Sequence, residues 1–206
     1  MPAEGVIQFA YELTDGAVPE DFAHRAELTA WRSILRQLDL VGQDPSRYEG
    51  FAYGNVSVRV KDGEFIITAS QTSGENELLD EHLVHITACN IERFWVDAVG
   101  AEPPSSESVT HAMVYAADQR VNCVLHIHNP EIWQASETLK LPSTPAEVQY
   151  GTTAMASAVA QLLATYQSRP MVFTTLGHED GVFACGHSPR DCGAALVNTL
   201  ARARAL

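Results

Sequence analysis

Two histidines, His126 and His128, end the apolar stretch 121–130 (VNCVLHIHNP). In an extended strand alternate side chains share a face, so we expect both imidazoles to point the same way. A pair of imidazoles on one face suits a divalent cation, and tetrahedral zinc in particular, which needs one more protein ligand and an open position to be catalytic. The same spacing also occurs in strands that bind no metal. The interpretation therefore depends on polar residues elsewhere in the chain.

Four short polar clusters stand in other parts of the chain. They are, in order, 54–57 (GNVS), 72–74 (TSG), 105–107 (SSE) and 177–181 (GHEDG). Each has an ordinary structural explanation when taken singly: a bulge or tight bend, a polar loop, the capped start of a helix, and a turn between two strands. The residues alone leave these alternatives open.

In this order and spacing the clusters resemble the class II aldolase/adducin family, which includes zinc-dependent fuculose-1-phosphate aldolases, rhamnulose phosphate aldolases and pentulose-phosphate 4-epimerases. The resemblance runs from about Phe51 to the C-terminal helix and is most specific over 104–130 (PSSESVTHAMVYAADQRVNCVLHIHNP). By position it implies three zinc ligands, His126, His128 and His178, and a catalytic carboxylate, Glu107. It also implies a phosphate pocket formed by Asn55, Ser73, Gly74, Ser105 and Ser106.

The implied chemistry suits these residue types. Three neutral histidines leave Zn²⁺ its double charge, so the ion can act as a Lewis acid and stabilise an enediolate. Glu107 would move a proton, and Ser105 and Ser106 before a helix would bind a phosphate. We therefore expect a zinc-dependent lyase that cleaves a small phosphorylated sugar or sugar acid by an aldol reaction. Decarboxylation, epimerisation or dehydration, a non-catalytic adducin-like binding module, and iron or manganese oxygen chemistry are the alternatives.

Three departures from the family pattern concern the substrate. His178 is followed by Glu179 and Asp180, whereas the family usually continues with glycine. The stretch after the His-x-His strand is short, and Tyr150 is the nearest counterpart of the tyrosine that reaches a neighbouring subunit's site; it is equally explained as a packing residue. Because the chain stops at Leu206, we expect no C-terminal tail over the pocket.

We expect His111 to be an interior hydrogen-bonding residue rather than a support for a metal ligand.

The elements that must position these residues follow from hydrophobic periodicity and capping signals. We predict helices over 20–41, from just after Ser105 and Ser106 to about 119, over 152–166, and from Pro189, with Ser188 as its N-cap, to the C-terminus. We predict strands over 5–13, 51–60, 64–69, 83–88, 91–98, 171–175 and 182–185, besides the His-x-His strand. The resemblance implies one α/β domain over 1–206, with three layers and a largely antiparallel central sheet. About 20 N-terminal residues would be peripheral to it.

The amino-acid composition limits the classes of molecule that we expect this chain to bind. With 206 residues, of which 46% are hydrophobic, the chain can bury one sizeable core. A formal charge of −13 and no cluster of Lys or Arg argue against nucleic acid or an anionic membrane as partner. Four cysteines without a Cys-x-x-Cys pair, no signal peptide and no long apolar stretch indicate a soluble cytoplasmic protein. The resemblance adds a homotetramer with active sites between subunits.

Overall fold

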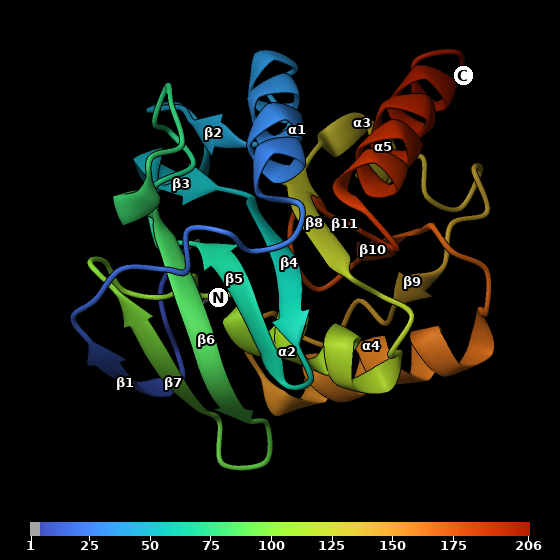
Figure 1. The fold of residues 1–206 in the computed structure, drawn as a ribbon. Coiled ribbons are helices and arrows are strands. Elements are labelled where there is room, and N and C mark those ends of the chain that lie inside the picture. Colours follow the sequence, from blue (N-terminus) through green and yellow to red (C-terminus); the bar gives the residue numbers. More distant parts are fainter. Residues whose placement is uncertain (1–4) are drawn as a thin grey trace.

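A mixed sheet of nine strands forms the middle layer of the computed structural model, which describes residues 5–206 (Figure 1). Its strands are β1 (Ala10–Thr14), β4 (Asn55–Lys61), β5 (Glu64–Thr68), β6 (Leu83–Asn90), β7 (Trp95–Gly100), β8 (Cys123–His128), β9 (Ser143–Thr144), β10 (Met171–Thr175) and β11 (Gly181–Gly186). Their order across the sheet is β1-β7-β6-β5-β4-β8-β11-β10-β9. The two outermost pairs, β1–β7 and β10–β9, are parallel, and the inner pairs are antiparallel. The largely antiparallel sheet is thereby confirmed.

Helices cover both faces of this sheet. They are α1 (Arg25–Gln37), α2 (Ser108–Ala117), α3 (Pro130–Gln134), α4 (Thr153–Thr165) and α5 (Pro189–Ala203). Helices α1, α3 and α5 lie on one face, and α2 and α4 lie on the other (Figure 1). The predicted three-layer α/β fold is therefore confirmed. None of the helices described within residues 5–206 is long and apolar enough to cross a membrane.

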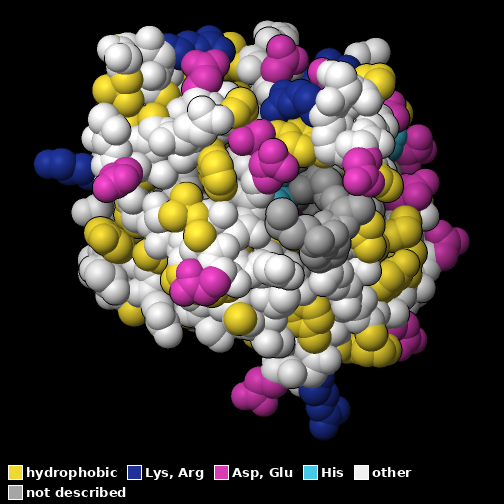
Figure 2. All heavy atoms as spheres, turned by 180° about the vertical axis from the view of Figure 1, so that it is seen from behind, with side chains coloured by type: hydrophobic (Ala, Val, Ile, Leu, Met, Phe, Trp, Pro, Cys, Tyr) yellow, Lys and Arg dark blue, Asp and Glu magenta, His cyan; other side chains and the backbone are white. Residues whose placement is uncertain are grey.

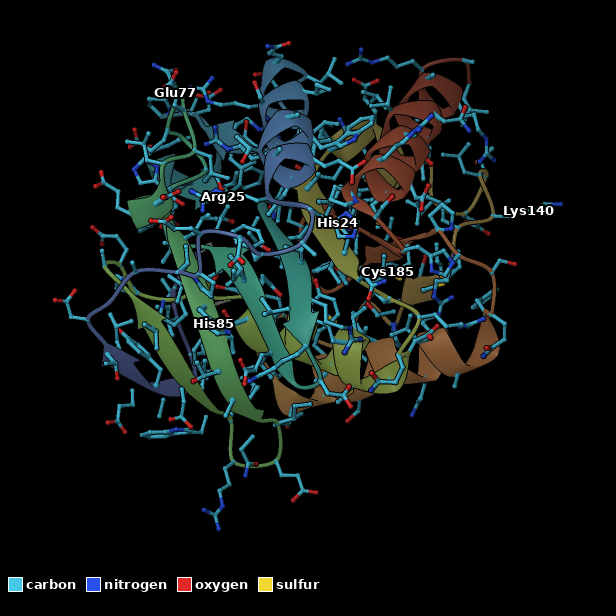
Figure 3. The ribbon with its side chains drawn as sticks, in the orientation of Figure 1. His24, Arg25, Glu77, His85, Lys140 and Cys185 are labelled. Atoms are coloured by element: carbon cyan, nitrogen blue, oxygen red, sulfur yellow. The ribbon has the colours of Figure 1, made fainter. Side chains whose placement is uncertain are left out.

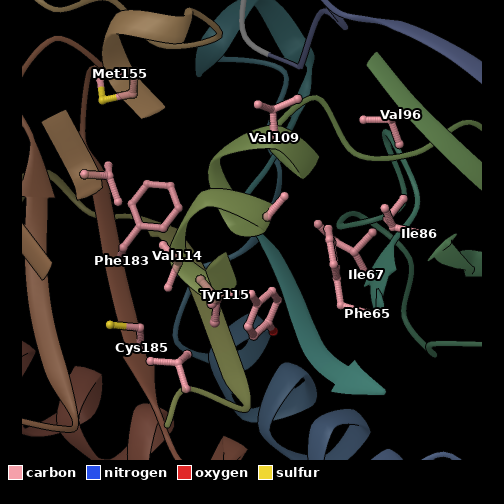
Figure 4. Packing of buried hydrophobic residues seen from close by; sticks show 14 of the residues in the cluster. Phe65, Ile67, Ile86, Val96, Val109, Val114, Tyr115, Met155, Phe183 and Cys185 are labelled. Atoms are coloured by element: carbon pink, nitrogen blue, oxygen red, sulfur yellow. The ribbon is translucent and has the colours of Figure 1, made fainter. Parts of the chain in front are cut away.

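Each face of the sheet has its own apolar core, because side chains alternate along every strand. On the α2 and α4 face, Val114 and Tyr115 pack against Phe65 of β5 and Phe183 of β11 (Figure 4). On the opposite face, α1 and α5 bury a second cluster that includes Leu35 and Leu196. Along β8 the alternation places Val124, in the first cluster, on the same face as His126 and His128. The α2 and α4 side of the sheet is thus the side on which the histidines lie.

The capping signals mark the true ends of the later helices. The Ser188 Oγ accepts the N–H of Asp191 at 3.1 Å, and Pro189 occupies the first turn of α5. Thr152 caps α4 in the same way, accepting the N–H of Met155 at 3.1 Å. Both predicted starts are confirmed, and the C-terminal end of α5 lies at Ala203.

Helix α1 is shorter than predicted, spanning 25–37 instead of 20–41. His24 has a φ of 66° and Asp39 a φ of 55°, both in the left-handed region that a helix cannot contain. The Leu40 carbonyl accepts the N–H of His128 at 2.9 Å, so the chain leaves the helix to pair with the end of β8. Helix α2 likewise ends at Ala117 instead of 119.

Two strand predictions need correction. The predicted strand 51–60 is divided at Gly54 into β3 (Ala52–Tyr53), which pairs with β2 (Gly42–Gln43), and β4. Gly54 has a φ of 76°, and a Cβ there would lie 2.9 Å from the carbonyl oxygen of His126, so the close approach to β8 requires glycine. The predicted strand 91–98 starts too early, because β6 continues to Asn90 and residues 91–94 form the hairpin turn.

The N-terminal strand and the short elements also differ from prediction. The strand predicted over 5–13 lies at 10–14, where it forms the outer edge beside β7. The sequence did not predict α3, β2 or β9, which have five, two and two residues. The short 3₁₀ turns at Tyr48–Gly50 and Asp80–His82 were also missed. Such pieces carry too few residues for a periodic signal.

Candidate metal centre

His126 and His128 lie at the end of β8 with their ring nitrogens facing each other. The two Nε2 atoms are 3.1 Å apart, and both side chains are fully buried. The shared face predicted from the His-x-His spacing is confirmed. Asn55, on β4, stands directly opposite His126 in the strand ladder.

The third histidine comes from the turn between β10 and β11. His178, His126 and His128 each offer a ring nitrogen, and these atoms all lie within 4.8 Å of one another. The turn comes close to the segment before α4: a Cβ on Gly177 would overlap the carbonyl oxygen of Val148 at 1.8 Å. Glycine at 177 is therefore required for this turn to pack where it does.

Hydrogen bonding fixes the form of His126. Its Nδ1 lies 3.2 Å from the carbonyl oxygen of Val182, and because a carbonyl only accepts, Nδ1 must carry the proton. The Nε2 lone pair then points toward His128, as in histidines that bind a metal through one nitrogen and a backbone carbonyl through the other. Burial, and next the nearby His178, hold the pKa of both His126 and His128 well below the usual value. Both imidazoles are therefore neutral, which is the form that binds a metal.

Aromatic rings stack on two of the three imidazoles. The Phe183 ring stacks on His126 with centroids 4.1 Å apart, and the Tyr150 ring stacks on His178 at 4.4 Å. The Tyr150 hydroxyl donates to the carbonyl of Val6 at 3.3 Å. Tyr150 is thus a packing partner of the third histidine in this chain.

Glu107 immediately precedes α2 and lies beside the histidine cluster. Its Oε1 is 3.5 Å from the His178 Nδ1, and both residues are buried. A buried carboxylate next to three imidazoles can add a charged group to a bound cation or exchange a proton with a substrate. The structure brings Glu107 to the cluster, as the resemblance implied.

Four of the five residues assigned to the phosphate pocket line one small hollow. Asn55, Ser73, Ser105 and Ser106 border it together with Gly5. The Asn55 Oδ1 is buried without a hydrogen-bond partner among the described residues, so this oxygen can still accept a hydrogen bond from a ligand. The space is about 10 Å³, the room for one water molecule, so a phosphate would enter only with movement of the border. Gly74 lies in the same loop but does not border the hollow.

Sequence reasoning missed a network beside His128. Asp180 accepts the Tyr48 hydroxyl at 2.7 Å, and the Tyr48 ring meets the His128 ring edge-on at 4.7 Å. Arg47 donates to the hydroxyls of Tyr48 and Tyr53 at 2.8 and 3.2 Å. The unusual carboxylates after His178 were the available signal; Asp180 is bound in this network, whereas Glu179 is exposed.

The donor set fits a divalent metal. Three buried, converging imidazoles, two of which are held neutral by burial, form the ligand type that zinc prefers and leave positions open on the ion. The carbonyl that orients His126 supplies the outer hydrogen bond common in metal sites.

Residues 44–205 match the family described as class II aldolase and adducin N-terminal domain. The chain belongs to this family. No curated protein matches it.

Several solved structures share the fold of this chain at low sequence identity. The YgbL protein of Klebsiella pneumoniae, described as a putative aldolase/epimerase/decarboxylase, has 18% identity and a TM-score of 0.66, with 89% of this chain and 87% of that chain covered. An l-fuculose-1-phosphate aldolase from Thermus thermophilus has 21% identity and a TM-score of 0.63, with 87% and 90% covered. A sugar-phosphate aldolase from Thermotoga maritima has 15% identity and a TM-score of 0.63, with 86% and 90% covered.

Proposed function

We propose that this class II aldolase family member is a zinc-dependent lyase that cleaves a carbon–carbon bond in a small phosphorylated sugar or sugar acid. One observation carries the proposal: the Glu107 Oε1 lies 3.5 Å from the His178 Nδ1, in a buried cluster of three histidines. A carboxylate in that position is suited to removing a proton from a hydroxyl of a substrate bound beside it.

In the proposed reaction the three histidines and Glu107 would have different roles. His126, His128 and His178 would hold zinc, which when bound supplies Lewis acidity toward adjacent carbonyl and hydroxyl oxygens. Glu107 would accept a hydroxyl proton at Oε1 as the carbon–carbon bond breaks to give an aldehyde and an enediolate. It would then return the proton to the enediolate carbon, so that no net proton is consumed.

The hollow would hold the phosphate of the substrate. Ser105, Ser106 and Asn55 border it, and Glu107 directly follows the two serines. The loop 72–74 would complete the pocket with Ser73 and Gly74. A phosphate anchored there would orient the reacting carbons against Glu107 and the metal.

Zinc content and cleavage of ketose 1-phosphates, followed by release of dihydroxyacetone phosphate, test the proposal on the same preparations. Glu107→Gln should retain about one zinc per chain and lose at least about 100-fold in kcat, the usual effect of removing a general acid–base. His128→Ala should lose the zinc. His187→Gln is the matched control, because His187 is an exposed histidine whose Nδ1 lies 2.9 Å from the Arg120 carbonyl oxygen.

Four outcomes would contradict the proposal. Unchanged cleavage in Glu107→Gln would remove the carboxylate from the mechanism. Full occupancy by another metal would exclude zinc as the cofactor. No bound metal after zinc is offered would favour a non-catalytic adducin-like module. Release of carbon dioxide, or epimerisation or dehydration without cleavage, would assign the site to those reactions instead.

A further inference from the structure

Two arginines of α1 donate hydrogen bonds to the backbone of the loop 72–74. The Arg32 Nη2 donates to the carbonyls of Thr72 and Ser73, each at 3.1 Å. One helical turn later, the Arg36 Nη2 donates to the carbonyl of Gly74 at 2.9 Å. Three successive carbonyls of the loop are thus turned toward guanidinium groups of one helix.

Arg32 is an unusual residue for this position, because its side chain is buried with only 2% exposed. Among residues 5–206 its Nη1 has no hydrogen-bond partner, and its donated bonds go to neutral carbonyls. A buried cation without a bonded carboxylate is costly for the fold unless another charge compensates it. The Glu75 carboxylate acts on Arg32 only at a distance, without a hydrogen bond among the described residues, so the guanidinium can also balance an anion bound at the loop.

Peptide geometry determines what the loop offers on its other side. In a trans peptide the N–H of one residue points opposite to the C=O of the residue before it. Because the carbonyls of Thr72 and Ser73 point at Arg32, the N–H groups of Ser73 and Gly74 point away from it. Ser73 borders the hollow, and Arg32 does not. The two amides therefore point away from Arg32, and Ser73, which carries the first of them, borders the hollow.

The Ser73 hydroxyl is not available to donate a hydrogen bond to an anion, so only backbone N–H groups of the loop can do so. Its hydroxyl donates to the carbonyl of Gly54, so its proton is already committed. The next N–H along the loop, that of Glu75, returns to the Thr72 carbonyl at 3.1 Å and is committed as well. The amides of Ser73 and Gly74 are the donors that remain for an anion.

We infer that Arg32 and Arg36 are positioning residues of an anion site: they hold the loop so that the amides of Ser73 and Gly74 bind the phosphate of the substrate, and Arg32 supplies the buried counter-charge through the loop. Neither arginine touches the phosphate. The inference rests on the proposed function for the identity of the anion as a substrate phosphate. The chain has a net charge of −13, which disfavours binding of a dianion. A buried cation close to the neutral backbone donors offsets this unfavourable charge locally.

Binding of inorganic phosphate, followed through backbone amide resonances at constant ionic strength, tests the inference. In the wild type the Ser73 and Gly74 amides should shift as phosphate is added. Arg32→Met should weaken phosphate binding about tenfold, as expected for the loss of a charge-assisted interaction, and Arg36→Gln by a smaller factor. Arg32→Lys, which keeps the charge, should recover most of the affinity. Arg25→Gln is the matched control: it removes a cation from the same helix, but Arg25 pairs with Asp80 and lies at the start of α1 (Figure 3).

The readout separates a positioning role from a merely structural one. Phosphate binding that is equal in the wild type, Arg32→Met and Arg36→Gln would overturn the inference, as would silent Ser73 and Gly74 amides in a wild type that binds phosphate. So would a wild type that binds no phosphate. If Arg32→Met does not fold, the Arg36→Gln titration decides, with weaker binding supporting the inference and unchanged binding overturning it. The titration requires neither zinc nor turnover, so a failed cleavage assay does not contradict the inference. Cleavage with a KM unchanged in Arg32→Met and Arg36→Gln would contradict the inference and leave the proposed lyase activity intact.

Discussion

At the scale of single residues, His111 shows how one imidazole near a candidate metal centre serves the interior instead. Its Nδ1 lies 2.7 Å from the Ser57 Oγ, which in turn lies 2.7 Å from the Tyr115 hydroxyl. His111 is fully buried, and this burial lowers its pKa to about 3. The expected role as an interior hydrogen-bonding residue is confirmed.

This low pKa predicts a specific loss of stability in acid. The unfolded chain binds a proton at His111 near pH 6.5, whereas the folded chain does so only near pH 3, so the unfolded state binds more protons in between. Stability therefore falls as the pH falls below 6.5, by about 2 kcal/mol from this residue at pH 5. Urea unfolding of zinc-free protein at pH 7 and pH 5 should show a smaller loss in His111→Gln than in the wild type.

His126 and His128 titrate in both proteins, and their contributions cancel in that comparison. His187→Gln, at an exposed position, controls for the removal of a histidine. An equal pH dependence in His111→Gln and the wild type would show that His111 does not contribute.

At the scale of elements, the Asp180–Tyr48 hydrogen bond joins the β10–β11 turn to the 3₁₀ turn at Tyr48–Gly50. The β10–β11 turn carries His178, and the Tyr48 ring packs edge-on against the His128 ring. The two elements are 132 residues apart in sequence, so this bond sets the turn of the third ligand relative to the strand of the first two.

We predict that Tyr48→Phe weakens zinc binding about tenfold, the lower range for loss of an outer hydrogen bond at a metal site. The ring is retained, so the edge contact with His128 stays and the hydrogen bond alone is removed. Competition with a chromophoric chelator measures the zinc affinity. Tyr166→Phe, which changes an exposed tyrosine, should bind zinc as the wild type does. Equal affinity in the two variants would mean that the bond does not position the turn.

At the scale of the whole molecule, acidic side chains are spread over the face seen in Figure 2 rather than gathered in one patch. The metal centre, in contrast, joins distant parts of the chain, with ligands from β8 and from the turn before β11. A ligand that binds only this assembled state stabilises the entire fold by mass action.

Removal of zinc should therefore lower the melting temperature. At a free zinc concentration of 100 times Kd the stabilisation is about 2.7 kcal/mol. For a chain of this size that corresponds to a shift in Tm of about 5–10 °C. Calorimetry with and without EDTA should show the shift in the wild type and none in His128→Ala. A chelator effect of the same size in His128→Ala would place the metal elsewhere.

The homotetramer implied by the family resemblance remains a prediction at this scale. Ile34 and Leu38, one turn apart near the end of α1, have 38% and 36% of their surface exposed, as residues of an interface between copies would in a single chain. Sedimentation velocity at micromolar concentration should give four times the chain mass of 22.4 kDa. A monomer would contradict the prediction.

The sequence by itself determined those features that depend on neighbouring residues. The period of two in a strand places His126 and His128 on one face, and local capping by Thr152 and Ser188 starts α4 and α5 where expected. The order and spacing of the polar clusters were sufficient to predict the family, and the family resemblance in turn predicted the three-layer fold.

Only the tertiary structure decided contacts between distant segments. It shortened α1, because the Leu40 carbonyl bonds to the N–H of His128, and it set Glu107 beside His178. It also placed Arg32 behind the loop 72–74, a contact that joins residues 40 and 41 positions apart. Nothing in the local sequence distinguishes Arg32 from any other helical arginine. Packing of α1 against the sheet brings it to those carbonyls, and packing of distant elements leaves no periodic signal along the chain.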